Sequence, residues 1–183
     1  MPDPVRLTGM ALTIAQIEAI AIDKAQVTID PDAAPRMRKG RAVVETYLKD
    51  KVPAYGLTTG LGVRVGDMLP DSALADFSTR LVRGRAQGVG EPLSESAVRA
   101  VMAVRLNTML TGATGQSEGL AEFIGEALNR GFYPVMPRQA SIGAADLVAM
   151  AALAAGLVGE GEAMRDGKRV PAAGALTALG LAP

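Results

Sequence analysis

The stretch of residues 137–160 decides the fold of this chain. It reads Pro137-Arg-Gln-Ala-Ser141-Ile-Gly-Ala-Ala-Asp146-Leu-Val-Ala-Met-Ala-Ala-Leu-Ala-Ala-Gly-Leu-Val-Gly-Glu160, and the twelve residues after Asp146, 147–158, carry no charge. Asp is a favoured N-cap, a helix that is apolar on all sides is buried, and twelve residues are too few to cross a bilayer. The pattern therefore predicts a buried helix that Asp146 caps.

The N-terminus of such a helix suits an anion or a developing negative charge, because unpaired N–H groups and partial positive charge gather there. The residues that would supply these oxyanion-type donors are Gly143, Ala144, Ala145 and Asp146. An ordinary core helix with a tight entry is the simpler interpretation, and this stretch alone leaves both open.

Composition narrows the class of protein. The 183 residues include 19 Lys and Arg, 19 Asp and Glu, no Cys and no His. Balanced charge gives no indication of nucleic-acid or membrane binding, and the missing Cys and His remove the commonest metal ligands and general base. We expect one region, 1–183, with a sizeable core and no metal site. The start Met1-Pro-Asp-Pro does not resemble a signal peptide, so we expect a cytoplasmic protein.

Apolar periodicity predicts a mainly α fold with short extended segments. Thr13 and Ser94 are predicted helix caps, and Asp30-Pro31 a helix start. The expected helices are 12–22, 30–49, 71–85, a helix from 94, 116–130, 147–158 and 172–179, with extended pieces at 27–29 and 133–137 and a hairpin turn at 166–168. Large side chains are few, so we hypothesise that contact with other chains supplies part of the burial.

Two groups of polar residues lie within these predicted helices. Arg36, Arg38, Lys39 and Arg41 are interpreted as a solvated face in preference to an anion site. Arg105 and Asn107 interrupt an apolar helix, and we predict that they are buried, hydrogen-bonded structural residues.

A glycine-rich loop occupies residues 53–62, Pro-Ala-Tyr55-Gly-Leu-Thr-Thr59-Gly-Leu-Gly62. Three Gly and two Thr in its last seven residues predict a loop, but the Gly-Lys-Ser/Thr of a phosphate-binding loop is missing. A flexible connector is one interpretation. The other is a catalytic loop, because Tyr can act as a general acid–base and Tyr55 stands at its entrance.

Together these motifs resemble the aromatic amino acid ammonia-lyases, which act on histidine, phenylalanine and tyrosine. Residues 141–147 are similar to the family's Ser-Ile/Val-Gly-Ala-Ser-Gly-Asp-Leu, and residues 55–62 to its Tyr-Gly-Val/Ile-Asn-Thr-Gly-Phe-Gly. Further similar segments are 85–93, 105–112 and 133–137. The resemblance runs from about residue 12 to 183 and implies the N-terminal part of the ammonia-lyase/fumarase-like helical bundle.

The resemblance also implies site residues. Tyr55 inherits the catalytic acid/base role on a mobile lid, and Thr59 and Gly62 match substrate-binding positions of that loop. Arg85 stands where histidine and tyrosine lyases have an active-site His. Because Arg does not release its proton near neutral pH, Arg85 can bind an anionic part of the substrate but cannot be a base. An ordinary loop ion pair is the alternative for Arg85.

The chain departs from the family at the residues that form its electrophile. In the family, Ala-Ser-Gly cyclises to a methylidene-imidazolone, and the Ser loses water. Here the segment is one residue shorter, Ala145 has no hydroxyl to lose, and Ser141 is followed by Ile142 instead of Gly. We predict that no methylidene-imidazolone forms and that the chain has no cofactor.

Three functions remain open. The favoured one is an electrophile-free lyase subunit that eliminates an amine from an amino-acid-type substrate, with Tyr55 as acid/base. It is similar to the ergothioneine-type trimethylamine lyases, and a second chain would supply the C-terminal lyase portion in a hetero- or homo-oligomer. The alternatives are a non-catalytic, lyase-derived partner protein and a truncated fragment of a conventional lyase.

Overall fold

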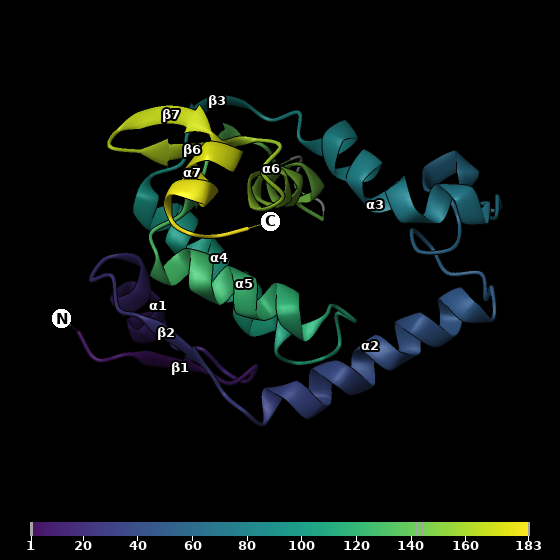
Figure 1. The fold of residues 1–183 in the computed structure, drawn as a ribbon, viewed down its shortest axis with the longest axis horizontal. Helices are drawn as coiled ribbons and strands as arrows, with labels where there is room; N and C mark the ends of the chain where they lie inside the picture. The colour runs from purple at the N-terminus through teal and green to yellow at the C-terminus, as the bar shows by residue number, and fades with distance from the viewer. Residues whose placement is uncertain (1, 142, 144, 183) are drawn as a thin grey trace.

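The computed structural model describes residues 2–141, 143 and 145–182 and shows a mainly helical molecule with short strands (Figure 1). Its helices are α1 (Ile14–Ala21), α2 (Ala33–Lys49), α3 (Asp71–Arg85), α4 (Glu95–Met109), α5 (Glu118–Asn129), α6 (Leu147–Leu157) and α7 (Ala172–Ala178), with a 3-10 turn η1 (Gly62–Arg64). Its strands are β1 (Val5–Leu7), β2 (Val27–Ile29), β3 (Val89–Pro92), β4 (Tyr133–Pro134), β5 (Pro137–Gln139), β6 (Glu162–Arg165) and β7 (Lys168–Pro171). The mainly α prediction is confirmed.

The core forms where α4 packs against α1 on one side and α5 on the other. Ile20, Met102, Leu106 and Leu128 are completely buried there, and each such side chain stabilises the fold by roughly 1.5–3 kcal/mol relative to an exposed one. The parallel pair β1–β2 lies along the outer side of this core. We refer to this packed region, made of α1, α4, α5, β1 and β2, as the base.

The two predicted helix caps that carry a hydroxyl, Thr13 and Ser94, are confirmed. Thr13 Oγ1 accepts from Gln16 N at 3.2 Å and the Gln16 side chain accepts from Thr13 N at 2.9 Å, which is the predicted cap of α1. Ser94 Oγ accepts from Ala97 N at 3.2 Å and so caps α4. The hairpin turn is also confirmed, because Asp166 and Gly167 both have positive φ between the antiparallel strands β6 and β7.

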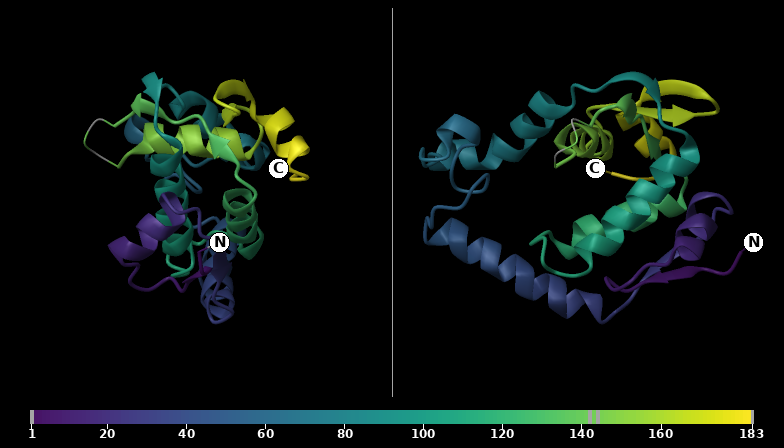
Figure 2. Two further views of the ribbon diagram at one scale, coloured as in Figure 1. Left: turned by 90° about the vertical axis from the view of Figure 1, so that its left-hand side faces the viewer. Right: turned by 180° about the vertical axis from the view of Figure 1, so that it is seen from behind.

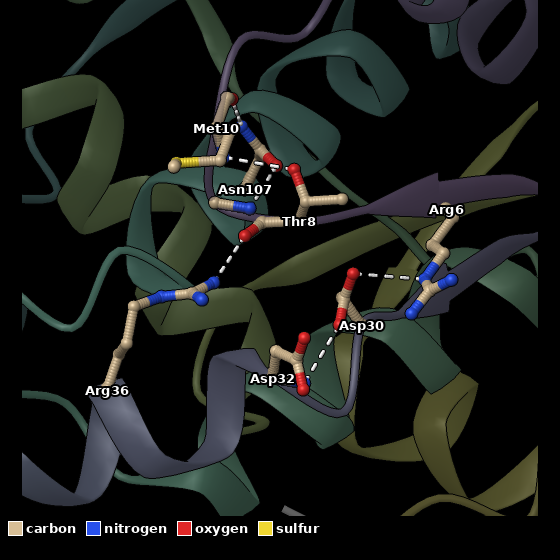
Figure 3. A network of polar contacts seen from close by, with 8 residues as sticks. Arg6, Thr8, Met10, Asp30, Asp32, Arg36 and Asn107 are labelled. Atoms are coloured by element: carbon tan, nitrogen blue, oxygen red, sulfur yellow. Dashed lines mark hydrogen bonds and ion pairs between the residues drawn. The ribbon is translucent and has the colours of Figure 1, made fainter.

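The predicted start of α2 at Asp30-Pro31 is wrong. The Asp30 carboxylate accepts from Asp32 N at 2.8 Å and pairs with Arg6 at 3.1 Å, so it closes a turn ahead of the helix, which begins at Ala33 (Figure 3). The Asp32 amide, followed by Arg6, holds the pKa of Asp30 below its ordinary value. Asp30 thus closes a local turn before the helix and also pairs with Arg6 on β1.

An arm made of α2, the following loop and α3 extends from the core (Figures 1 and 2). The buried residues of α2, Ala33 and Met37, lie in its first half. Gly40 lies against Gly112 so closely that a Cβ at Gly40 would be 1.8 Å from the Gly112 carbonyl oxygen. Arg36 donates to the backbone oxygen of Thr8 (Figure 3). It also donates to the backbone oxygen of Leu110. The second half of α2 carries the glycine-rich loop away from the core.

The contacts of Arg36 correct one hypothesis about the basic cluster on α2. Arg38 and Lys39 are exposed, as a solvated face requires, and Arg38 pairs with Glu118 at 3.1 Å. Arg36 instead ties the arm to the backbone of the base.

The two polar residues of α4 differ from each other. Asn107 accepts from Gly9 N at 2.9 Å and donates to Met10 O at 2.8 Å, which confirms the predicted hydrogen bonding, although the residue is only half-buried (Figure 3). Arg105 is only half-buried and makes no hydrogen bond or ion pair within the described ranges, so the prediction of a buried, bonded arginine is wrong there.

In the part of the chain that the structure describes, no helix is both long and apolar enough to cross a membrane.

Candidate active site

The glycine-rich loop is closed by two buried threonines. Thr58 Oγ1 accepts from Ala54 N at 2.8 Å and donates to Val52 O. Thr59 Oγ1 lies within 3.3 Å of Ala54 O, and its side chain is turned into the loop instead of toward solvent. These internal bonds favour a shaped loop over a flexible connector, and they give Thr59 a role in that shape.

Tyr55 lies on the outer side of this loop, where it is 65% exposed. Its phenol oxygen accepts a hydrogen bond from Gly62 N at 3.2 Å. Gly62 has φ +57, a left-handed conformation that favours glycine. Because the oxygen accepts this bond, the phenol can donate its own proton elsewhere, and the same amide can donate to the oxygen in either protonation state. The loop therefore presents Tyr55 with its oxygen held and its proton available.

The entry to α6 differs from the sequence prediction. Asp146 has φ +44 and makes no capping hydrogen bond to the described part of the helix. Its carboxylate instead accepts from the Ser141 hydroxyl, which in turn accepts from Gly143 N at 3.0 Å. The predicted Asp146 cap is wrong because a hydroxyl five residues earlier competes for the carboxylate. Asp146 thus leaves the first-turn amides of α6 uncapped.

Of the four predicted donor residues at this turn, Gly143 already gives its N–H to Ser141. Ala145 precedes Asp146 with φ +57, so two consecutive non-glycine residues are left-handed. Ala144 and Ile142 lie outside the described residues. The remaining donors of the helix start come from Ala145, Asp146 and the first turn of α6.

Burial of α6 also departs from the prediction. Its middle and end, from Ala151 to Leu157, are largely buried, but Leu147 is 51% and Val158 49% exposed. The helix packs against α3 and β4 and, more lightly, against α7 and β6. An uncharged helix is therefore only partly covered by the described residues, and its two ends are open.

Arg85 is the last residue of α3, and it is exposed. Its side chain makes no hydrogen bond or ion pair with the residues that the structure describes. Arg83 by contrast forms a two-bond pair with Glu160, Nε to Oε2 at 2.6 Å and Nη2 to Oε1 at 2.5 Å. This pair, which the sequence did not indicate, lowers the pKa of Glu160 and joins α3 to the end of α6. The ion-pair alternative thus belongs to Arg83, and the Arg85 guanidinium is available for an anion.

The structure brings some of these residues together and separates others. Antiparallel pairing of β3 with β5 sets Val89 opposite Gln139, which places the segment after Arg85 beside the segment that leads into the α6 turn. Tyr55, Thr59 and Gly62 share one loop between α2 and α3, at the far end of the arm (Figure 1). No hydrogen bond or ion pair within the described ranges joins that loop to residues 143–146. The predicted site residues thus lie on separate parts of the chain.

Arg99 is a polar residue whose position the sequence reasoning missed. It is 2% exposed, and its guanidinium donates to Ile20 O at 2.8 Å and Leu128 O at 3.1 Å. These carbonyls lie at the ends of α1 and α5, where partial negative charge collects. In the sequence, Arg99 directly follows Val98, a residue of the apolar face of α4, and this position could have indicated that Arg99 is buried. Arg99 joins two helix ends inside the base and lies away from the arm.

Comparisons with known proteins bear on the whole chain. A family model described as aromatic amino acid lyase matches residues 12–183. Histidine ammonia-lyase from Koribacter versatilis (strain Ellin345) is 38% identical over 178 residues, which is 97% of this chain and 34% of the relative. Histidine ammonia-lyase from Geobacillus thermodenitrificans (strain NG80-2) is also 38% identical, over 97% of this chain and 35% of its own length.

Solved structures with similar folds belong to related enzymes. The ergothioneine-degrading enzyme ergothionase from Treponema denticola, in complex with desmethyl-ergothioneine sulfonic acid, superposes with a TM-score of 0.94 at 29% identity, over 99% of this chain and 36% of that one. Tyrosine aminomutase from Streptomyces globisporus superposes with a TM-score of 0.92 at 32% identity, over 98% and 34%. The chain spans about a third of the length of the curated relatives it matches. Since the family model covers nearly all of its residues, the chain belongs to the aromatic amino acid lyase family.

Proposed function

We propose that this chain is a lyase subunit that eliminates an amine from an amino-acid-type substrate, and that a second chain supplies the C-terminal part of the lyase fold. The observation that carries the proposal is Tyr55, exposed on a shaped loop with its oxygen fixed by the Gly62 amide at 3.2 Å. Kinship with histidine ammonia-lyases supports the reaction class. The chain covers about a third of those relatives, so the proposal assigns the remaining site residues to the second chain.

Tyr55 acts as the acid/base of this elimination. In its deprotonated form it takes a proton from the carbon next to the amine-bearing carbon. The electrons of that C–H bond form the carbon–carbon double bond, and the amine leaves with the electrons of its own C–N bond. The Gly62 amide holds the oxygen throughout, and a positioned acid/base contributes roughly 10²–10⁴-fold in rate.

The start of α6 stabilises negative charge that develops on the substrate. Ala145 and Asp146 precede the helix, and the Asp146 carboxylate accepts from Ser141 and leaves the first helical amides uncapped. Preorganised amides of this kind stabilise an oxyanion without reorganisation.

The residues present do not fit the methylidene-imidazolone of the family. Ala145 has a methyl group where water would have to be lost, and the nearby Ser141 hydroxyl is bonded to Asp146 and Gly143. We therefore propose that no cofactor takes part and that the leaving group departs unaided. A quaternary amine such as trimethylamine meets that need, and similarity to ergothionase supports it.

Arg85 selects the substrate by binding an anionic group. It replaces the His of histidine and tyrosine lyases, it is exposed, and its neighbour Arg83 is already paired with Glu160. A planar guanidinium binds carboxylates and similar anions through two parallel hydrogen bonds. The substrate class is thus an amino-acid-type betaine with an acidic side group.

A non-catalytic, lyase-derived partner protein is the alternative, and the missing hydroxyl at Ala145 is the observation that favours it. Such a protein would shape or stabilise its partner without taking part in proton transfer. The hypothesis of a truncated fragment does not explain why the Tyr55 oxygen is held by the Gly62 amide.

The test is amine release by the complex purified from the native host, with aromatic and acidic trimethylammonium betaines as substrates. Tyr55→Phe removes the phenol oxygen, so we expect at least a 100-fold lower rate, the lower end of the usual acid/base contribution. Tyr47→Phe changes a tyrosine on α2 that is 39% exposed, and it should keep the wild-type rate. Equal rates in the two variants would favour the non-catalytic alternative.

A further inference from the structure

An apolar hollow of about 190 Å³ lies between α4, α5 and α6. Its lining side chains include Met109, Leu120, Ile124, Met150, Leu153 and Leu157. We refer to it as the α4–α5–α6 groove. Pockets for drug-sized ligands have volumes of roughly 300–1,000 Å³, so this groove is too small for such a molecule and is large enough for a few protein side chains.

Two polar groups at the groove lack partners in the part of the chain that the structure describes. Gln116 Oε1 is buried and accepts no hydrogen bond there. The half-buried guanidinium of Arg105 borders the same groove without an ion pair among the described residues. Buried carbonyl oxygens are normally satisfied, and a half-buried cation attracts a carboxylate. The groove thus requires a hydrogen-bond donor and an acidic group.

Helix α6, which forms one wall of the groove, is apolar on all sides but is only partly buried. Helix α6 and Val158 carry no charge on any side, and a helix that is apolar all round is found buried. Yet Leu147 and Val158 are each about half exposed, and Leu120 across the groove is 37% exposed. A further element must pack here if this surface is to be shielded from water.

We propose that the α4–α5–α6 groove receives an amphipathic helix of the second chain, with apolar side chains in the groove and a carboxylate opposite Arg105. The inference rests on the proposed function, which introduces that second chain. The groove lies between helices and presents no strand edge, so a helix packed ridge-into-groove suits it. Ergothionase superposes on 99% of this chain with only 36% of its own residues, which leaves ample polypeptide to cover the same face.

A photo-crosslinking amino acid at Val158 tests the position of the helix. The full chain is expressed in its native host, the complex is purified, and the crosslinked peptides are identified by mass spectrometry. We expect peptides from a chain similar to the C-terminal part of the lyase family. A crosslinker at Val43, which is 55% exposed on α2, serves as the control and should give at least tenfold less of that product. Crosslinks to a second copy of this chain, to an unrelated protein or to nothing would overturn the proposal.

Charge reversal tests the acidic partner. Arg105→Glu should weaken binding of the second chain at least tenfold, and the matched Lys39→Glu on the exposed part of α2 should change it less than twofold. Circular dichroism checks that both variants fold, and Arg105→Lys should recover part of the affinity. Equal affinity of Arg105→Glu and wild type would contradict the proposed contact.

The two proposals fail in different ways. A complex that eliminates an amine but gives no crosslink from Val158 to its partner would overturn the groove assignment and leave the function intact. A complex that crosslinks at Val158 but releases no amine would overturn the catalytic role and leave the docking intact.

Discussion

At the scale of single residues, the site depends on a few backbone positions that hold side chains in unusual places. Gly62 adopts φ +57 and so directs its amide to the Tyr55 oxygen. Ala145 and Asp146 adopt positive φ without being glycine, and Asp146 gives its carboxylate to Ser141. The sequence could indicate Gly62, because glycine is the usual residue at positive φ. It could not indicate the Ser141–Asp146 bond, because Asp is equally suited to a cap.

Gly62→Ala tests the link between backbone and phenol. A Cβ at this position meets nothing within 4 Å, so the change adds no clash. Left-handed backbone costs a non-glycine residue roughly 1–2 kcal/mol, and relaxation would move the amide away from Tyr55. We expect about a tenfold lower rate of amine release, on the order of the 1.4 kcal/mol that a factor of ten represents. Gly66→Ala, also in open space but without a positive φ, should keep the wild-type rate.

Charged residues outside the site make stability depend on pH. The hydrogen bond from Lys24 lowers the pKa of Glu95, and the one from Arg83 lowers the pKa of Glu160. A carboxyl whose pKa is lower in the folded state adds stability above its unfolded pKa, and this stability is lost as the pH falls through the folded pKa. Unfolded Glu titrates at about pH 4.3. We therefore expect the free energy of unfolding to fall below about pH 4.

Urea unfolding at a series of pH values measures this loss. Glu160→Gln removes one of the two carboxyls, so its free energy of unfolding should fall less steeply with acid than that of the wild type. Arg83→Ala should show the same shallower slope because it breaks the same pair. A wild-type slope in both variants would contradict the assignment.

At the scale of elements, Tyr55 is held by the arm, and the arm is anchored to the base where Gly40 lies against the Gly112 backbone. The bounds of α3 and the caps of α1 and α4 were predictable because local patterns and hydroxyls determine them. The start of α2 was not, because the Asp30 carboxylate accepts from the Asp32 amide in a turn ahead of the helix, a use of Asp that the sequence does not distinguish from a cap. The exposed ends of α6 were unpredictable for a related reason: an apolar run indicates burial without saying which residues provide the cover.

Gly40→Ala tests the anchor of the arm. A Cβ there would be 1.8 Å from the Gly112 carbonyl oxygen, so α2 would have to move. Overpacking of this kind costs about 1–3 kcal/mol, and displacement of α2 would carry the Tyr55 loop with it. Thermal unfolding and amine release should both decrease. Gly84→Ala, in a helix with nothing within 4 Å, should instead stabilise the chain by up to about 1 kcal/mol. Equal effects of the two changes would contradict the anchor.

At the scale of the whole molecule, the candidate site is distributed over separate elements. Tyr55 belongs to the arm, Arg85 to the end of α3, and the amide donors to the start of α6. The N-terminal family architecture was predictable because short motifs recur in order from residue 12 to 183. The second chain and the absence of a cofactor stay predictions. Apolar surface at the two ends of α6, with Leu147 and Val158 exposed, agrees with a further chain packing there.

Native mass spectrometry of the chain purified from its native host tests the central claim most directly. The account predicts a stable complex with a second, larger chain that is similar to the C-terminal part of the lyase family. That complex would then be the enzyme to assay for amine elimination. Recovery of this chain only as a monomer or as a self-assembly, with no second chain bound, would contradict the account and remove the main support for Tyr55 as a catalytic residue.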